Sequence, residues 1–120
     1  MFARTFIILT LWLCATAQSN NGNTIYRPYD PGVTPPVATF HPEPDYTKQA
    51  RDKKIQGTVR VWILLGKDGK VDNLKVEKPL EPSLDANALK TVKTWQFKPC
   101  QKDGNPVYCS LSVEVSFHLQ

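Results

Sequence analysis

Alternation of apolar and polar residues over one segment is the feature that most constrains what this chain can fold into. The apolar residues recur at every second position: Val59, Val61, Ile63 and Leu65. This period is typical of a strand with one buried face. The Asp68-Gly69 pair follows, and glycine tolerates the positive φ of a tight hairpin turn. We therefore predict that residues 57–78 form two paired strands whose apolar face the rest of the chain covers.

The final residues of the chain, 107–119, alternate just as regularly. One parity is apolar: Cys109, Leu111, Val113, Val115, Phe117 and Leu119. The other parity is mainly polar: Tyr108, Ser110, Ser112, Glu114, Ser116 and His118. The pattern predicts a long strand with one face on the core and the other face in water.

Two segments have the spacing of short helices. The first covers residues 46–54, where Asp45 or Thr47 is a candidate N-cap because its side-chain oxygen can accept from the free amides of the first turn. The second follows Ser83, another candidate cap. Its apolar residues form one stripe: Leu84, Ala88, Val92 and Trp95. We predict that this stripe packs on the buried face of the hairpin.

The order strand, strand, helix, strand limits how these pieces can be joined. Sequential strands usually pair, and a crossover between parallel strands is nearly always right-handed. The simplest arrangement is an α+β fold, in which a three-stranded sheet of order 2-1-3 carries two helices on one face. The final strand would then be an edge with unpaired amides and carbonyls. Recognition of peptides by strand addition uses such an edge.

The amino-terminal segment has the three parts of a secretory signal. Its start carries one arginine and no acid, residues 6–13 are nearly all apolar, and small residues follow at 15–17. We therefore predict that residues 1–17 are removed after export. An uncleaved membrane anchor and a lipid anchor on Cys14 remain as alternatives. A membrane anchor would need about 20 apolar residues, whereas a polar run begins here at Gln18.

Residues 18–42 have the composition of a proline-rich linker. Six of the ten prolines of the chain lie between residues 18 and 45. Proline lacks an amide donor and favours extended conformations. Val37 and Phe40 are apolar enough to contact the domain, so we expect a linker that is loose at first and docked near Phe40.

Cys100 and Cys109 are the two cysteines that remain once residues 1–17 are removed. An even pair in an exported chain usually forms a disulfide, and we predict one here. Free thiols and metal ligation stay as alternatives, although no pair of histidines accompanies the cysteines as it would in a zinc site.

The sequence has no recognisable catalytic arrangement. His41 and His118 lie at opposite ends of the predicted domain, and there is no Gly-rich phosphate loop or suitably spaced pair of carboxylates. The 15 Lys and Arg residues against 11 Asp and Glu are too dispersed to indicate a nucleic-acid protein. We therefore expect no enzyme activity, no metal or other cofactor, no small-molecule substrate and no nucleic-acid partner.

Trp62 presents a problem for a simple two-layer domain. It has the outward parity of the first strand, opposite to the apolar positions Val61 and Ile63. A large apolar side chain on an open face is usually covered. The linker, a second copy of the chain or a partner could cover it.

Several motifs, in their order and spacing, resemble the TonB carboxy-terminal domain family. They are Gly57-x-Val59-x-Val61, the Asp68-Gly69 turn, Leu84-Asp85-x-x-Ala88, Trp95-x-Phe97-x-Pro99 and Val113-x-Val115-x-Phe117. The match covers about residues 43–119, and we assign residues 43–120 to such a domain. The family fold, a small α+β domain with two helices on one face of a three-stranded sheet, agrees with the sheet inferred above.

The resemblance implies a periplasmic protein-interaction module that takes part in TonB-dependent transport. In the family, extended segments of outer-membrane receptors add to the edge of the last strand. The outward residues of that strand are therefore candidate contacts: Ser110, Ser112, Glu114 and Ser116. In the family, the stretch before the first helix also contacts the receptor. The resemblance therefore adds Glu43, Pro44 and Tyr46 as candidate contacts, although this chain has Thr47 where the family commonly has proline.

The amino terminus departs from the family pattern, because TonB proteins keep a membrane helix. The short apolar segment here predicts a freestanding periplasmic domain, with an inner-membrane-anchored form as the alternative. For function, the alternative is a non-transducing envelope scaffold, or a domain that forms homodimers through its free edge.

Overall fold

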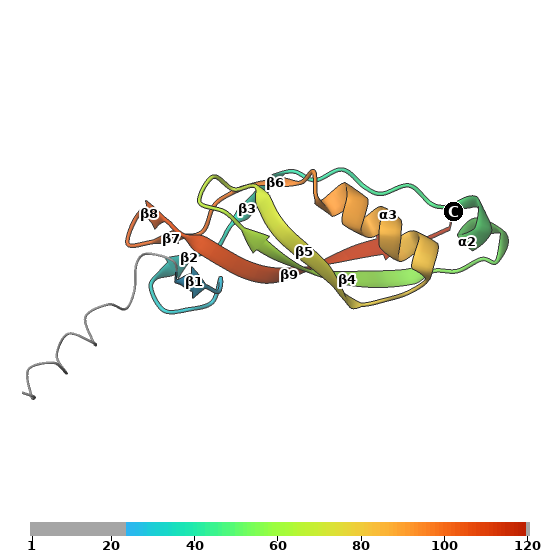
Figure 1. Ribbon diagram of the computed structural model, residues 1–120, viewed down its shortest axis with the longest axis horizontal. Coiled ribbons are helices and arrows are strands. Elements are labelled where there is room, and N and C mark those ends of the chain that lie inside the picture. Colours follow the sequence, from blue (N-terminus) through green and yellow to red (C-terminus); the bar gives the residue numbers. More distant parts are fainter. Residues whose placement is uncertain (1–23, 120) are drawn as a thin grey trace, which may run out of the picture.

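The computed structural model describes residues 24–119 (Figure 1). The predicted signal at residues 1–17 lies outside the described residues. The described part of the chain contains two helices and nine strands in three sheets. The largest sheet has four strands in the order β1-β9-β4-β5. Their bounds are β1 (Ile25–Tyr26), β9 (Tyr108–Phe117), β4 (Gly57–Leu65) and β5 (Val71–Lys78).

The central strand of this sheet is β4. Along one side it pairs antiparallel with β9 over its whole length, from Gly57 opposite Phe117 to Leu65 opposite Cys109. Along the other side it pairs antiparallel with β5, with two register shifts. The predicted hairpin and the predicted order of the three long strands are both confirmed.

Two smaller sheets complete the fold. One contains β2 (Val33–Thr34), β7 (Gln101–Lys102) and β8 (Asn105–Pro106), and the other contains β3 (Val37–Phe40) and β6 (Gln96–Lys98). The prediction of a single three-stranded sheet is therefore wrong. These strands are too short to show a period in the sequence, because two to four residues contain at most two repeats of an alternating pattern.

The assignment of residues 18–42 to a linker needs correction over residues 25–40. In that stretch β1, β2 and β3 pair with β9, β7 and β6, which all come from the last quarter of the chain. Pro28, Pro31 and the Pro35-Pro36 pair fall between these strands, where the sheets require no amide donor. Proline therefore separates short strands here.

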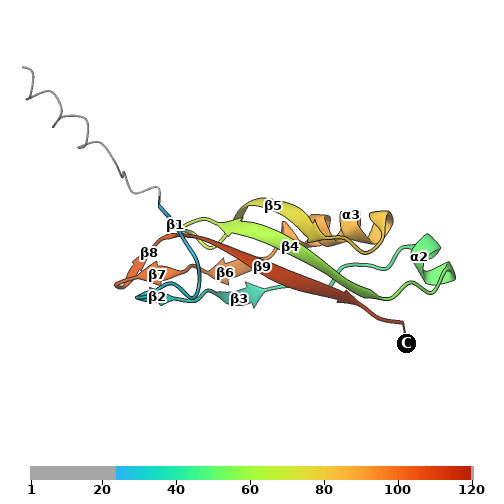
Figure 2. The same ribbon diagram turned by 90° about the horizontal axis from the view of Figure 1, so that it is seen from below.

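The longer helix, α3 (Pro82–Val92), packs across β4 and β5 as expected (Figures 1 and 2). Leu84, Ala88 and Val92 are fully buried. The N-cap is Glu81, not Ser83: the Glu81 carboxylate accepts from the Leu84 amide at 2.9 Å. The Ser83 hydroxyl donates to the same carboxylate and, as the largest cause, lowers the pKa of Glu81 from its ordinary value of 4.5.

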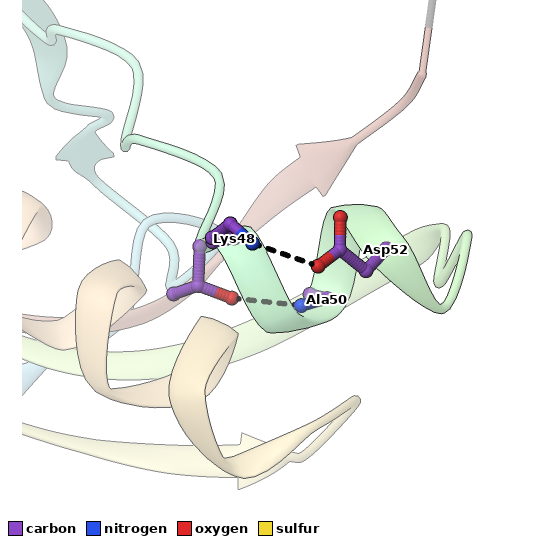
Figure 3. A network of polar contacts seen from close by, with 4 residues as sticks. Lys48, Ala50 and Asp52 are labelled. Atoms are coloured by element: carbon purple, nitrogen blue, oxygen red, sulfur yellow. Dashed lines mark hydrogen bonds and ion pairs between the residues drawn. The ribbon is translucent and has the colours of Figure 1, made fainter.

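The shorter helix, α2 (Lys48–Asp52), lies at one end of the domain (Figure 2). Its N-cap is Thr47, whose Oγ1 accepts from the Ala50 amide at 3.1 Å (Figure 3). Thr47 Oγ1 also lies 2.8 Å from Ser83 Oγ, which joins α2 to the first turn of α3. The Lys48–Asp52 ion pair at 3.4 Å is exposed, and such surface pairs contribute little to stability.

The apolar core lies between the sheet and α3. Its largest fully buried side chains are Val59, Val61, Ile63, Leu65, Leu84 and Val92. A disulfide joins Cys100 and Cys109, the pair that the sequence predicts, and both residues are fully buried. Because Cys109 is the second residue of β9, the bond fixes the start of that strand to the segment after β6.

Gly69 lies in the loop between β4 and β5 and contacts β6. Its φ is +82°, and a Cβ at this position would lie 1.8 Å from the carbonyl oxygen of Phe97. The Phe97 amide donates to the Gly69 carbonyl at 2.9 Å. A side chain at residue 69 is therefore excluded both by the backbone conformation and by the close approach of β6.

Replacing Thr47 by alanine should lower the free energy of unfolding by about 1 kcal/mol, because the first turn of α2 loses its cap. Thr47→Ser keeps the hydroxyl and should unfold close to the wild type. Urea unfolding of the three proteins measures the difference. Equal stability of Thr47→Ala and the wild type would show that α2 does not depend on its cap.

Replacing both Cys100 and Cys109 by serine should lower the free energy of unfolding by about 2.5–3 kcal/mol, the chain-entropy value for a loop of roughly ten residues. Thermal and urea unfolding of the oxidised wild type and of the double variant provide the comparison. The reduced wild type is the matched control, since it loses the bond without a change of sequence. A double variant as stable as the oxidised protein would contradict the expectation.

Candidate protein-interaction edge

The side of β9 that faces away from β4 is paired only at its beginning. There β1 runs parallel to β9, with Ile25 opposite Tyr108 and Tyr26 opposite Cys109. Beyond Cys109, the described residues place no other strand on this side of β9. The expectation that the whole final strand is a free edge is thus wrong for its first two residues. The edge is open from Ser110 onward.

Three surface hollows follow this edge of β9. The first hollow is lined by Arg27, Pro28, Tyr29, Trp62, Glu77, Ser110, Leu111 and Ser112. The second hollow is lined by His41, Pro42, Glu43, Pro44, Trp95, Glu114, Val115 and Ser116. The third hollow is lined by Pro44, Asp45, Tyr46, Arg51, Lys54, His118 and Leu119. Each hollow combines residues of the last strand or its end with residues that precede β4 in the sequence.

In the first hollow, polar contacts hold the outward side chains of the sheet. Ser112 Oγ donates to Glu77 Oε1 at 2.6 Å. The Lys75 ammonium lies 5.3 Å from the centre of the Trp62 ring, within the range of a cation–π contact. Trp62 is half-buried. Its neighbours include residues 27–29, so part of the chain's own proline-rich segment lies beside it.

In the second hollow, Trp95 positions the segment before α2. Its indole Nε1 donates to the Pro42 carbonyl at 2.9 Å, and its ring meets His41 edge to face with centroids 6.1 Å apart. The hydroxyl of Thr39 donates to the Gln96 carbonyl at 3.2 Å. These contacts, with the β3–β6 pairing, place residues 41–44 along the open part of β9.

In the third hollow, Tyr46 joins α2 to the end of β9. Its hydroxyl donates to the Ile55 carbonyl. Its ring meets Phe117 edge to face with centroids 5.6 Å apart, and the Arg51 guanidinium lies 5.7 Å from the ring centre. Tyr46 therefore stabilises the domain as well as lining its surface.

The charges along the edge are few and exposed. Glu114 pairs with Arg60 at 3.4 Å, with both side chains about half exposed, and such a pair contributes little. The other outward residues of the open part are serines: Ser110, Ser112 and Ser116. Because these side chains carry little specific chemistry, the unpaired backbone groups of β9 are the main chemical feature of the edge.

The structure brings together some of the candidate residues predicted from the sequence and separates others. Glu43 and Pro44 share the second hollow with Glu114 and Ser116. Ser110 and Ser112 lie in the first hollow, and Tyr46 lies in the third. The residues that sequence reasoning missed line the first two hollows: Arg27, Tyr29 and His41. All three were assigned to the linker; the aromatic rings of Tyr29 and His41 among the prolines were the available signal, and Arg27 had no such signal.

Within the described range of 24–119, neither helix has the length and hydropathy needed to span a membrane.

Replacing Trp95 by phenylalanine should keep the aromatic packing but remove the donor to Pro42. We expect the free energy of unfolding to fall by about 1 kcal/mol, the usual net value of one hydrogen bond, and amide hydrogen exchange to become faster in β3, which pairs with β6 directly before this segment. Exchange measured by mass spectrometry reports on β3, with α3 as the internal control. Unchanged exchange in β3 would show that this bond does not hold the segment against the domain.

Residues 42–119 match the family model described as Gram-negative bacterial TonB protein C-terminal. Over 87 residues the chain is 30% identical to the protein TonB of Vibrio cholerae serotype O1, in an alignment that covers 72% of this chain and 36% of that protein. The chain therefore spans about a third of the length of this curated relative.

The fold is similar to the solution NMR structure of the Pseudomonas aeruginosa TonB CTD. The TM-score is 0.58 at 21% sequence identity, and the superposition covers 77% of this chain and 91% of that one. At this identity the likeness concerns the fold alone. The family match, in contrast, extends over more than half of the sequence and includes the hairpin, α3 and the whole of β9. The chain belongs to the family of Gram-negative bacterial TonB protein C-terminal domains.

Proposed function

We propose that this chain is a periplasmic protein-interaction module of TonB-dependent transport, and that it binds an extended segment of an outer-membrane receptor. The segment adds to β9 as a further strand. The observation that carries the proposal is the edge of β9, which is open from Ser110 onward while its other side is fully paired with β4. Family membership supports the class of partner.

The physical basis is the row of backbone groups along the open edge. A strand paired on one side leaves amides and carbonyls that form hydrogen bonds with water or with another strand. An extended polypeptide can satisfy them along its length, and pockets beside the edge then select side chains. The second hollow lies where such pockets are required, between Glu114 to Ser116 and the segment at residues 41–44.

The pairing with β1 supports the use of this edge. Two residues from a distant part of the sequence already lie on it in parallel register. The backbone of β9 is therefore accessible and flat enough to accept an added strand at its beginning. A partner segment that docks at the open part would continue the same kind of pairing.

Proline substitution tests the proposal directly, because proline removes one backbone donor. Successive amides of a strand point to opposite sides, so of Ser112 and Val113 one amide faces β4 and the other faces the open edge. A proline whose missing amide faces β4 breaks a hydrogen bond of the sheet and lowers the thermal stability, whereas a proline on the open side breaks none. Of Ser112→Pro and Val113→Pro, the variant that unfolds at the temperature of the wild type is therefore the open-side variant. We expect this variant to bind a synthetic receptor amino-terminal peptide at least tenfold more weakly, a loss of about 1.4 kcal/mol.

Ser112→Ala is the matched control, since it removes the side-chain hydroxyl and keeps the amide; its affinity should equal that of the wild type. Calorimetry with the same peptide measures all four proteins. Full affinity in the open-side proline variant would rule out strand addition at this position. Absence of peptide binding to the wild type, with self-association in sedimentation, would favour the homodimer.

A further inference from the structure

The segment at residues 25–29, here called the strap, contacts two parts of the proposed binding region at once. Its first two residues form β1 on the edge of β9. The next three residues, Arg27 to Tyr29, line the first hollow together with Trp62 and Ser110 to Ser112. Both ribbon views place β1 and the turn after it beside the start of β9 (Figures 1 and 2).

The strap occupies backbone positions that a long docking strand would also need. Tyr108 and Cys109 pair with the strap along the side of β9 that is open from Ser110 onward. An edge can pair with one strand at a time, because each backbone group lies in the plane of the sheet. A partner segment that extends past Ser110 towards Tyr108 therefore meets the strap.

The strap is held by few contacts. Its direct ladder extends over two residues only, and Pro28 then removes the donor that a longer strand would use. The turn after it is closed by the Asp30 carboxylate, which accepts from the Arg27 amide at 2.8 Å. From the β7–β8 hairpin, Lys102 Nζ donates to the Pro31 carbonyl at 2.8 Å and lies 6.0 Å from the centre of the Tyr26 ring.

The outer surface of the strap is also open to water. The side chain of Ile25 is 51% exposed and that of Tyr29 is 74% exposed. Much of the apolar surface of these two side chains therefore stays in water, and release of the strap would free the first residues of the edge and open the hollow that it shares with Trp62. A contact of this kind is suited to reversible opening, because opening leaves the core under α3 intact.

We propose that the strap is a built-in competitor for the β9 edge, which limits docking to the part beyond Cys109 until it is displaced. The inference rests on the proposed function, strand addition to β9. A short partner segment binds beside the strap, whereas a long one binds at full strength only to molecules with the strap released. The apparent affinity for the long segment is then reduced by the fraction of molecules that are open.

The test releases the strap in the full chain with the double variant Ile25→Pro and Tyr26→Pro, which removes both amide donors of β1. The control is Thr34→Pro, which places a proline at exposed Thr34 in the β2–β7 ladder of the same amino-terminal region and changes no residue of β1. Two synthetic receptor peptides are compared, one of about six residues, which the open part accommodates, and one of about twelve, which reaches Tyr108 at about 3.3 Å per residue.

Strap release should raise the affinity for the long peptide at least threefold and leave the affinity for the short peptide unchanged. The Thr34→Pro control should bind both peptides as the wild type does. The indole N–H resonance of Trp62, assigned with Trp62→Phe, should shift in the double variant and stay in place in the control. This resonance reports on the strap without any peptide.

Each other result contradicts either the competition by the strap or the proposed function. An unshifted Trp62 resonance in the double variant would show that the strap does not depend on its pairing with β9. A shifted resonance with equal long-peptide affinity in the double variant and the wild type would show that the strap does not compete. If neither peptide binds any of the proteins while the resonance still shifts, the proposed function fails, and competition for that site fails with it.

Discussion

The pairing of β4 on both of its sides is the constraint on which the rest of the structure depends. A strand that is paired on both sides has no free backbone groups, so it can lie at the centre of the sheet and bury one complete face. Val59, Val61, Ile63 and Leu65 form that face, and α3 covers it. Because β5 and β9 occupy the two sides of β4, any further strand of this sheet has to attach to the far side of β5 or of β9, as β1 does.

β9 contributes side chains to the core and also presents an open backbone edge. Both are possible because its side chains point above and below the sheet, whereas its backbone groups lie in the plane of the sheet. Side chains alternate between the two faces of the sheet, so Cys109, Val115 and Phe117 are buried while Ser112 and Glu114 are exposed. Amides and carbonyls alternate within the plane of the sheet, between β4 and the open side. A strand added to the edge, as proposed, would therefore leave the core packing unchanged. The disulfide at Cys109 fixes the beginning of β9 to the segment after β6.

Many of the residues that lie beside the open edge of β9 belong to the segment before β4. Proline favours an extended backbone, and it has no amide donor. Strand pairing in a proline-rich segment is therefore confined to the short stretches between the prolines. In this chain those stretches are β1, β2 and β3, and each pairs with a strand from the last quarter of the sequence. The Trp95–Pro42 hydrogen bond and the Lys102–Pro31 hydrogen bond hold the same stretch against the domain. Both bonds use proline carbonyls, which remain acceptors although proline has no amide to donate.

The sequence by itself determined the long elements: the hairpin, the stripe of α3, the parity of β9 and the pairing of Cys100 with Cys109. The first three have a local signal, because a period of two or of 3.6 residues records which face is buried, whereas the disulfide was predicted from the even pair of cysteines in an exported chain. The candidate contact residues on β9 and before α2 come from the family resemblance, and their role in binding stays a prediction. Only the tertiary structure decided that residues 25–40 fold back, that Trp62 lies beside residues 27–29, and that Glu43 and Glu114 share one hollow. Contacts between residues 25–26 and 108–109 bring together distant parts of the chain through backbone groups that all residues except proline share. Such pairing leaves no mark in the side-chain pattern of either segment, and for that physical reason it becomes visible only in the folded molecule.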